Sequence, residues 1–299
     1  MTEPFIIETV DLQKNYGAVK ALDGLNLRVP KGSIYGFLGR NGAGKTTTIK
    51  TLLGMARPAG GQARVFGLAV DSRDASLQIR GRTGFVSEDK DLLDEMTVEE
   101  LIRFTASFYS RWRADLERRY QRSFDLPPER KVKALSRGTR TKLALLLALC
   151  RGAELLILDE PTSGLDPSMI EEVLQAIVAH VAGDELTVFF SSHQIGEVEQ
   201  IADGVTIIDR GRDAVSGALD ELRENYRRIR LVFDAEAPRA AFRAPGVVHV
   251  ERSGRSLTVL SSAGAGQIVE EARALEAVSV DVVPVTLKEI FLETVREEN

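Results

Sequence analysis

The sequence has very little cysteine and no long apolar run. Its only cysteine, Cys150, leaves no partner for a disulfide bond within the chain and suits a reducing compartment. The longest apolar run is residues 143–150, which is far shorter than the about 20 apolar residues that a membrane-spanning helix needs. We therefore predict no membrane span, and we interpret Cys150, which lies in that run, as a packed core thiol rather than a reactive one.

The N-terminus and the charge balance exclude further classes. Residues 1–5 have neither the basic stretch nor the apolar stretch of a secretion signal. The formal net charge is −5, which argues against a broad nucleic-acid-binding face but leaves room for a local basic patch. With 299 residues the chain is long enough for a full core and two domains. We expect a cytoplasmic protein without a nucleic-acid partner.

Strands and helices alternate through residues 1–221. Expected strands occupy residues 5–10, 25–29, 34–38, 64–66, 82–86, 155–158, 187–190 and 205–208. From about residue 88 to 150 the pattern becomes helical: Thr97 and Glu100 form a capping box, and a later helix begins at Ser136. A further helix is expected over residues 169–181. This order predicts an α/β fold with a mostly parallel sheet and a helical insertion.

The last part of the chain, residues 222–299, has a different pattern. Alternating apolar residues predict strands at 229–233, 247–251, 257–260 and 278–285, with helices at 266–275 and 287–295. We expect a small separate α+β domain here.

Some aromatic and histidine residues have ordinary structural explanations. Phe104, Phe108 and Trp112 recur at helical spacing, which favours packing within a helix over a ligand-binding box. His180 lies late in an expected helix and His249 lies in the C-terminal domain, so we interpret both as structural residues.

A phosphate-binding motif stands between an expected strand and an expected helix. It matches GxxxxGK[ST] at every fixed position, and its residues are Gly39, Arg40, Asn41, Gly42, Ala43, Gly44, Lys45 and Thr46, followed by Thr47. Glycine-rich backbone can curl its N–H groups around a phosphate, and the helix N-terminus adds partial positive charge. In this motif the lysine reaches the β- and γ-phosphates and the threonine ligates Mg²⁺. The sequence predicts binding of a nucleoside triphosphate.

Two carboxylates follow the apolar strand at residues 155–158. Asp159 and Glu160 stand at the strand's C-terminal end, where α/β sheets bind ligands. We assign Asp159 to the Mg²⁺ shell and Glu160 to activation of the attacking water. His193 also follows a strand, at residues 187–190, from where it can donate to a γ-phosphate.

Taken together, residues 1–215 resemble the ATP-binding-cassette (ABC) ATPases. This resemblance implies a P-loop NTPase core with an antiparallel β subdomain. Besides the motifs above, the resemblance rests on residues 135–139 as the signature loop and residues 163–166 as the loop after the acidic pair. Tyr16 stands where the family stacks an aromatic ring on adenine, although it could also simply close a turn, and Glu88 stands at the coupling-loop position, where it would meet ATP and Mg²⁺. The catalytic residues implied are Glu160, His193 and Lys45.

The family resemblance also implies partners. Two ATP molecules would be sandwiched in a head-to-tail homodimer or heterodimer, with Ser136, Arg137, Gly138 and Asp166 facing ATP on the other subunit. A separate transmembrane permease would hold the protein at the inner face of the cell membrane. In the family, part of the surface that carries Phe104, Phe108 and Trp112 forms the groove for that partner, so contact with the permease is the alternative to packing within a helix. Glu88 replaces the family's usual glutamine, and Arg137 and Thr139 depart from the usual signature. Glu88 and Arg137, together with the C-terminal extension, are features that resemble those of the ATPases of ABC-2-type exporters.

We therefore expect an ATP-hydrolysing subunit that dimerises on ATP and drives a permease for export. A soluble ABC protein that acts on ribosomes or DNA is one alternative, but those types carry two cassettes or a cassette split by a coiled coil. A regulator that barely hydrolyses ATP is another. The presence of Lys45, Asp159, Glu160 and His193 argues against it.

Overall fold

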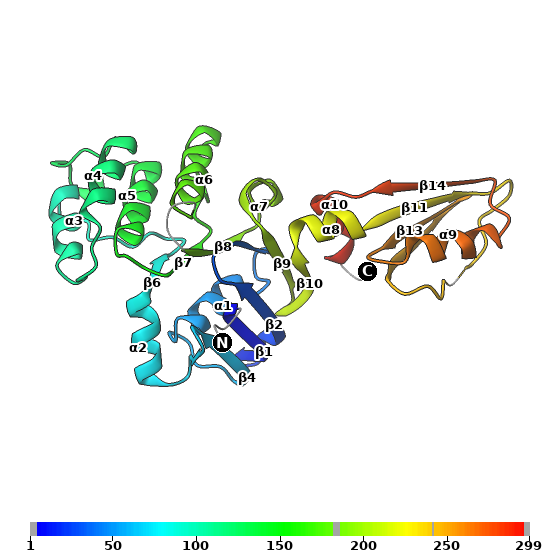
Figure 1. Ribbon diagram of the computed structural model, residues 1–299, viewed down its shortest axis with the longest axis horizontal. Helices are drawn as coiled ribbons and strands as arrows, with labels where there is room; N and C mark the ends of the chain where they lie inside the picture. Colours follow the sequence, from blue (N-terminus) through cyan, green and yellow to red (C-terminus); the bar gives the residue numbers. More distant parts are fainter. Residues whose placement is uncertain (1–4, 182–185, 241, 296–299) are drawn as a thin grey trace. The chain divides into compact units, whose positions relative to one another are not determined.

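The computed structural model describes residues 5–181, 186–240 and 242–295 (Figure 1). The chain divides into two units, Met1–Ser216 and Gly217–Asn299. This division lies five residues before the domain boundary that we placed after residue 221. None of the helices in the described ranges has the length and apolar character that crossing a bilayer requires.

The central sheet of the first unit has six strands in the order β10-β9-β3-β8-β7-β6. Neighbours from β9 through to β6 all pair in parallel, so the prediction of a mostly parallel α/β sheet is confirmed. The strands are β3 (Ile34–Leu38), β6 (Thr83–Val86), β7 (Leu155–Asp159), β8 (Thr187–Ser192), β9 (Gly204–Asp209) and β10 (Arg212–Ala218). Because β7 and β8 are neighbours, their C-terminal ends bring acidic and hydroxyl side chains together.

A second, antiparallel sheet has the order β2-β1-β4-β5. Its strands are β1 (Phe5–Tyr16), β2 (Val19–Pro30), β4 (Gly60–Val65) and β5 (Leu68–Ala69). One buried cluster joins this sheet to β3, β8 and helix α1 (Lys45–Leu52), and its members include Leu25, Phe37, Ile49, Leu52 and Phe189. The helix that carries Lys45 is thus anchored on its apolar side, which leaves its N-terminus at the edge of the central sheet.

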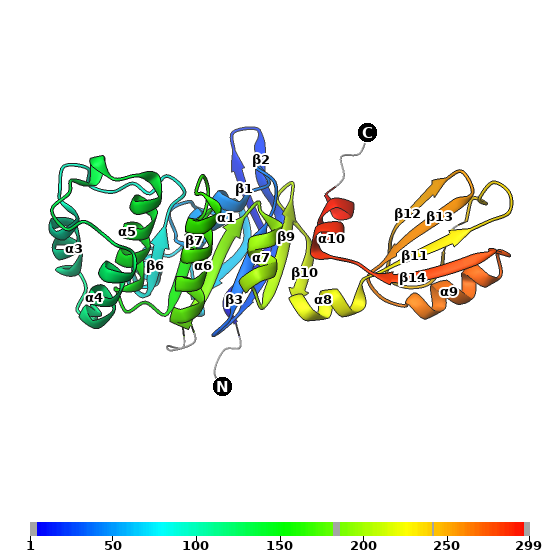
Figure 2. The same ribbon diagram turned by 90° about the horizontal axis from the view of Figure 1, so that it is seen from above.

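Helices α3 (Val98–Ala106), α4 (Ala114–Ser123) and α5 (Arg137–Leu149) form a group beside β6 and β7 (Figures 1 and 2). The capping box of α3 is confirmed, since Thr97 Oγ1 accepts from Glu100 N and Glu100 Oε2 accepts from Thr97 N. Helix α5 begins where predicted, after Ser136. Cys150 at its end is fully buried, and burial raises the pKa of its thiol to about 12, as expected for a packed core thiol.

The predicted packing role of the aromatic stripe is wrong for two of its members. Helix α3 ends at Ala106, and Phe104 and Phe108 are 43% and 66% exposed, in edge-on contact with each other. Periodicity shows that residues share a face but cannot show that the face is covered. Trp112 is half-buried, and its Nε1 donates to Glu117 Oε2 at 2.6 Å. His180 is buried near Tyr120, consistent with a structural role.

Three further helices lie in the described part of the first unit. Helix α2 (Arg73–Arg82) follows β5, whereas α6 (Pro167–Val181) and α7 (Ile195–Ile201) contact β8. Of these, we predicted only α6.

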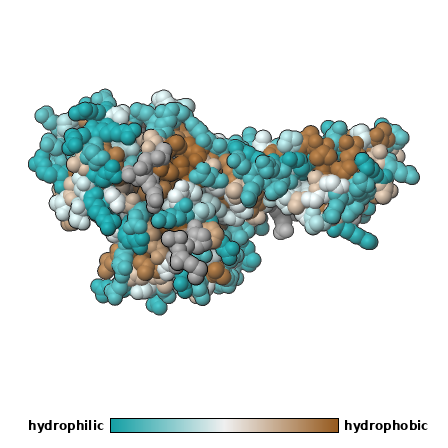
Figure 3. Space-filling view, in the orientation of Figure 1, coloured by the Kyte–Doolittle hydropathy of each residue, from teal (hydrophilic) through white to brown (hydrophobic). Residues whose placement is uncertain are grey.

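The second unit contains an antiparallel sheet in the order β12-β13-β11-β14. Its elements are α8 (Leu219–Asn225), β11 (Arg227–Val232), β12 (Val247–Ser253), β13 (Ser256–Ser261), α9 (Ala265–Arg273), β14 (Ser279–Pro284) and α10 (Leu287–Thr294). Helix α9 shares a buried core with β11 and β13. Strand β14 presents apolar surface that includes Val282 and Val283 (Figure 3). Apart from α8, this unit follows the predicted pattern closely.

Candidate nucleotide site

The loop between β3 and α1 is shaped by glycine. Gly42 and Gly44 have φ angles of 82° and 115°, a left-handed conformation that glycine adopts without strain. A Cβ on Gly44 would lie 2.8 Å from the carbonyl oxygen of Ala21, so no larger residue fits there. The loop ends at the N-terminus of α1, where backbone N–H groups and the helix dipole favour a bound anion.

An open cavity of about 370 Å³ lies over this loop. It is lined by Val19, Lys20, Ala21, Asn41, Gly42, Gly44, Lys45, Thr46, Thr47, Glu88 and Glu160. The structure thus brings together residues from the phosphate motif, the coupling loop and the acidic strand, as the sequence predicted. Tyr16, near the end of β1, is 49% exposed and lies under Lys14, whose Nζ is 4.9 Å from the ring centroid.

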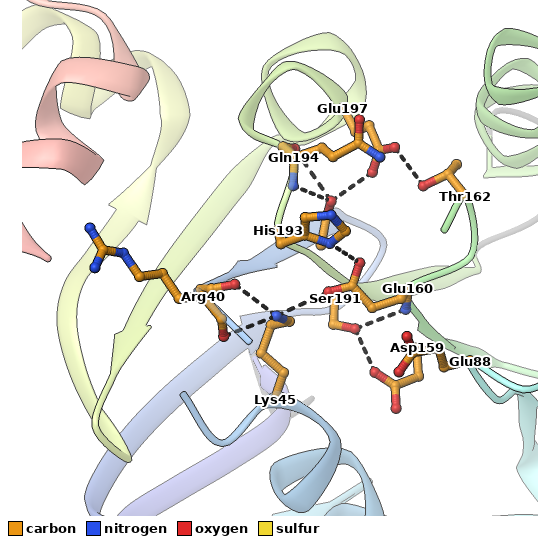
Figure 4. Close-up of polar contacts among 12 residues, drawn as sticks. Arg40, Lys45, Glu88, Asp159, Glu160, Thr162, Ser191, His193, Gln194 and Glu197 are labelled. Atoms are coloured by element: carbon orange, nitrogen blue, oxygen red, sulfur yellow. Dashed lines mark hydrogen bonds and ion pairs between the residues drawn. The ribbon is translucent and has the colours of Figure 1, made fainter. Parts of the chain in front are cut away.

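Lys45 is buried and held by three oxygen atoms. Its Nζ donates to the carbonyl oxygens of Gly39 at 2.7 Å and Arg40 at 3.3 Å. It also forms an ion pair with Glu160 Oε1 at 3.0 Å, and both side chains are 6% exposed (Figure 4). A phosphate that binds Lys45 must therefore compete with the Glu160 carboxylate.

Glu160 is positioned at both its side chain and its backbone. Its Oε2 lies 2.7 Å from His193 Nδ1, and its backbone N donates to Ser191 Oγ at 3.0 Å (Figure 4). Its φ of 47° is unusual for a residue other than glycine, and such a conformation costs on the order of 1–3 kcal/mol. The surrounding contacts hold the carboxylate in one place.

Ser191 links the side chain of Asp159 to the backbone of Glu160, and we did not predict this role. Ser191 lies directly across the sheet from Asp159 in the β7–β8 pairing, and its Oγ donates to Asp159 Oδ1 at 2.7 Å. Asp159 is only 2% exposed. The signal in the sequence is that both residues end apolar strands, but their alignment depends on the register of the sheet.

A second residue that we did not predict is Glu197, which lies on α7 and is 4% exposed. Its carboxylate accepts hydrogen bonds from Thr162 Oγ1 and Ser192 Oγ (Figure 4). Burial raises its pKa. The network fastens the segment after Glu160 to the segment that carries His193.

Glu88 is exposed at the edge of the cavity, whereas Lys90, two residues later, is buried. Lys90 Nζ donates to the carbonyl oxygens of Glu88 and Glu160. Burial lowers the pKa of its ammonium group. Lys90 gave no signal in the sequence, because a lysine in a polar loop is normally exposed.

The signature-loop residues lie at the start of α5. Ser136 is exposed, and its Oγ accepts from Thr139 N at 3.2 Å, as an N-cap residue does. Gly138 is needed for close packing, because a Cβ there would collide with Met169 Sδ. Arg137 packs its guanidinium over Gly164 of the same chain.

Asp166, which we predicted to face the other subunit, has a local role in this chain. Its Oδ1 accepts from Met169 N at 3.0 Å and Ser168 Oγ at 2.8 Å at the start of α6. The Met169 hydrogen bond is the largest cause that lowers the pKa of the Asp166 carboxyl.

The donor atoms near Lys45 suit Mg²⁺ bound together with a phosphate. In the described ranges no three or more His, Cys, Asp or Glu side chains form a cluster that could hold a metal by themselves. Mg²⁺ commonly binds through one or two carboxylates together with substrate phosphates and water. The Asp159 carboxylate, the Thr46 hydroxyl and the Glu88 carboxylate are oxygen donors of this kind.

Comparison with known proteins agrees with the resemblance that the sequence motifs indicated. The family model described as "ABC transporter" matches residues 22–163, and a second, described as "AAA domain, putative AbiEii toxin, Type IV TA system", matches residues 128–199. The bacitracin transport ATP-binding protein BcrA of Bacillus licheniformis is 38% identical over 225 residues, which are 75% of this chain and 73% of BcrA. The chain belongs to the ABC transporter ATP-binding proteins. The resemblance recognised from the motifs is thus confirmed.

Other members of the ABC family are similar to this chain in sequence or in structure. The daunorubicin/doxorubicin resistance ATP-binding protein DrrA of Streptomyces peucetius is 37% identical over 233 residues, 75% of this chain and 70% of DrrA. A solved structure described as the ATP binding subunit of an ABC transporter has a TM-score of 0.66 at 30% identity and covers 73% of this chain and 92% of its own. The ABC ATPase fold is therefore shown over about three quarters of the chain.

Proposed function

We propose that this ABC protein binds ATP with Mg²⁺, hydrolyses it, and powers a separate transmembrane permease. The observation that carries the proposal is the arrangement of Lys45, Glu160 and His193 beside the phosphate-binding loop. A buried carboxylate positioned by two partners next to an anion site suits a group that activates water for attack on a phosphate.

In this proposal the triphosphate takes Lys45 away from Glu160. The β- and γ-phosphates attract the Lys45 ammonium, which is a compact charge on a flexible stem. Glu160 then loses its ion-pair partner and can accept the proton of the attacking water, while His193 keeps its carboxylate oriented through Nδ1. ATP binding and activation of the base thereby become a single event.

Thr46, Glu88 and Asp159 would hold Mg²⁺ together with the phosphate oxygens. The ion supplies charge that neutralises the transferring phosphoryl group. Ser191 supports this set, because its hydroxyl donates to Asp159 Oδ1 and fixes the direction of that carboxylate.

The signature-loop residues would complete the site of a second subunit. Ser136 is exposed at the N-terminus of α5, and such a terminus favours an anion. We assign Ser136, Arg137, Gly138 and Asp166 to contacts with ATP on the partner, in a homodimer or heterodimer. Tyr16 would stack on the adenine ring.

For the setting, the named relatives support export. BcrA is described as a transport protein and DrrA as a resistance protein, so a permease for a compound harmful to the cell is the partner we propose. The protein would then lie at the cytoplasmic face of the membrane. We further propose that residues 1–221 form the ATPase domain and residues 222–299 an accessory domain.

The test compares the whole protein with Glu160→Gln. The variant keeps the shape of the side chain but cannot act as a base, so phosphate release should fall by about 10²–10⁴-fold, as for loss of general base catalysis. ATP binding, measured directly with a fluorescent analogue, should remain. Turnover near the wild-type rate in Glu160→Gln, or no turnover in the wild type, contradicts the proposed function.

A further inference from the structure

Lys90 is a buried lysine outside the proposed mechanism. It lies in the loop after β6, and only 3% of its surface is exposed. An ammonium group is costly to remove from water, so a buried lysine requires partners. Its Nζ donates to the carbonyl oxygen of Glu88 at 2.9 Å and to that of Glu160 at 3.2 Å. One side chain therefore joins the coupling loop to the backbone of the proposed base.

The backbone at both ends of this contact needs support. Lys90 and Glu160 have φ angles of 49° and 47°, and residues other than glycine stay in the left-handed region only where their surroundings hold them. The Glu160 carbonyl accepts from Ser163 N as well as from Lys90, while Glu160 N donates to Ser191 Oγ. Among these contacts, Lys90 supplies the one with a full charge, and charge-assisted hydrogen bonds are the stronger kind.

The charges around Lys90 also favour its position beside the acidic residues. The carboxylates of Glu88, Asp159 and Glu160 attract its ammonium group, and Arg137 repels it. Lys90 is not among the residues that line the cavity over the phosphate loop. Lys90 therefore offsets the negative charge of these acidic residues without lining the cavity that would hold the substrate. One of them, Glu88, stands where the family has a neutral glutamine.

We propose that Lys90 is a positioning residue for ATP hydrolysis. Its ammonium group ties the Glu88 segment to the Glu160 carbonyl and so fixes where the Glu160 carboxylate points. The inference rests on the proposed function, because it needs Glu160 to act in hydrolysis. It adds a residue to that function that acts through Glu160 and does not touch ATP.

The experiment measures kcat, KM and ATP affinity for Lys90→Met and Lys90→Arg in the full chain. Methionine has a similar length but donates no hydrogen bond, so kcat should fall roughly ten- to hundred-fold, as when a catalytic group is slightly misplaced. KM and ATP affinity should stay within about threefold, since the ATP contacts remain. Arginine keeps the charge and the donors and should restore kcat to within about tenfold of the wild type.

The matched control is Lys50→Met, the same change at an exposed position on α1, which should leave kcat unchanged. Melting temperatures show whether each variant is folded. If Lys90→Met is insoluble, Lys90→Gln replaces it; glutamine keeps a neutral donor but loses the charge, and a kcat below that of Lys90→Arg is then the expected result. A folded Lys90→Met variant, or Lys90→Gln in its place, that keeps the wild-type kcat overturns the inference, as does a loss that arginine does not restore. Inactivity of the wild type would instead overturn the proposed function.

Discussion

On the phosphate-loop side of the site, residues 39–47, the geometry comes from neighbours in the sequence. Gly42 and Gly44 take up left-handed backbone and lead directly into α1. On the carboxylate side, Asp159 and Glu160 depend on residues far away, since Ser191 and His193 come from β8 and the residue after it. The first side can be recognised from a motif, whereas the second requires the register of the sheet.

The two sides meet in one ion pair, Lys45 with Glu160. Both side chains are buried, and each lies against the opposite charge of the other. Substitutions on either side should therefore change both the rate of hydrolysis and the free energy of unfolding. These changes test how the two sides of the site differ.

Lys45→Met should have the largest effect of these tests. It removes the cation that would bind the phosphates, so kcat should fall by about 10²–10³-fold, the range for loss of one electrostatic donor. It also leaves Glu160 buried without its charged partner, which should cost about 3 kcal/mol of unfolding free energy. Phosphate release and urea unfolding measure the two effects. Lys50→Met, a control on the same helix, should change neither the rate nor the stability. Full activity in Lys45→Met would contradict the proposed link between the phosphate-loop side and the carboxylate side.

Glu88 sharpens the contrast on the carboxylate side. A glutamate offers Mg²⁺ a charged oxygen but repels the γ-phosphate, so the two effects oppose each other. Glu88→Gln should change the rate by less than about tenfold, or roughly 1.4 kcal/mol of barrier. Glu88→Ala should lose more activity and raise the Mg²⁺ concentration for half-maximal rate. An unchanged Mg²⁺ requirement in Glu88→Ala would mean that this side chain does not meet the ion.

Removal of the second unit should have the smallest effect on ATP binding. A chain that ends at residue 221 keeps all of β10 (Arg212–Ala218) and every residue that lines the cavity. Its ATP affinity should stay within about threefold of the full chain, roughly 0.7 kcal/mol. Loss of ATP binding in a folded truncated chain would show that residues 222–299 help to build the site.

The sequence allowed prediction wherever local rules decide the structure. The phosphate loop, the Thr97 capping box and the start of α5 at Ser136 follow from glycine conformation and helix capping, and all are observed. The strands of the second unit followed from the alternation of apolar residues, and its helices apart from α8 were also predicted. Residues 41–42 and 44–47 of the phosphate motif line one cavity together with Glu88 and Glu160, whereas Gly39, Arg40 and Ala43 are not among its lining residues.

The remainder depends on contacts that no local rule contains. Lys90 and Glu160 are 70 positions apart, and nothing in the sequence around Lys90 indicates that it is buried. Phe104 and Phe108 show the opposite error, because helical spacing favoured burial and the structure exposes them. The short helices α2 and α7 have too few apolar residues in a regular pattern to be recognised.

The most direct test of the central claim, that Glu160 activates water and that ATP joins two subunits, is the association state of Glu160→Gln with and without Mg-ATP. Sedimentation velocity should show a monomer without nucleotide and a stable dimer at saturating ATP, because the variant binds ATP and cannot consume it. A variant that remains monomeric while a binding measurement shows it saturated with ATP would contradict the account.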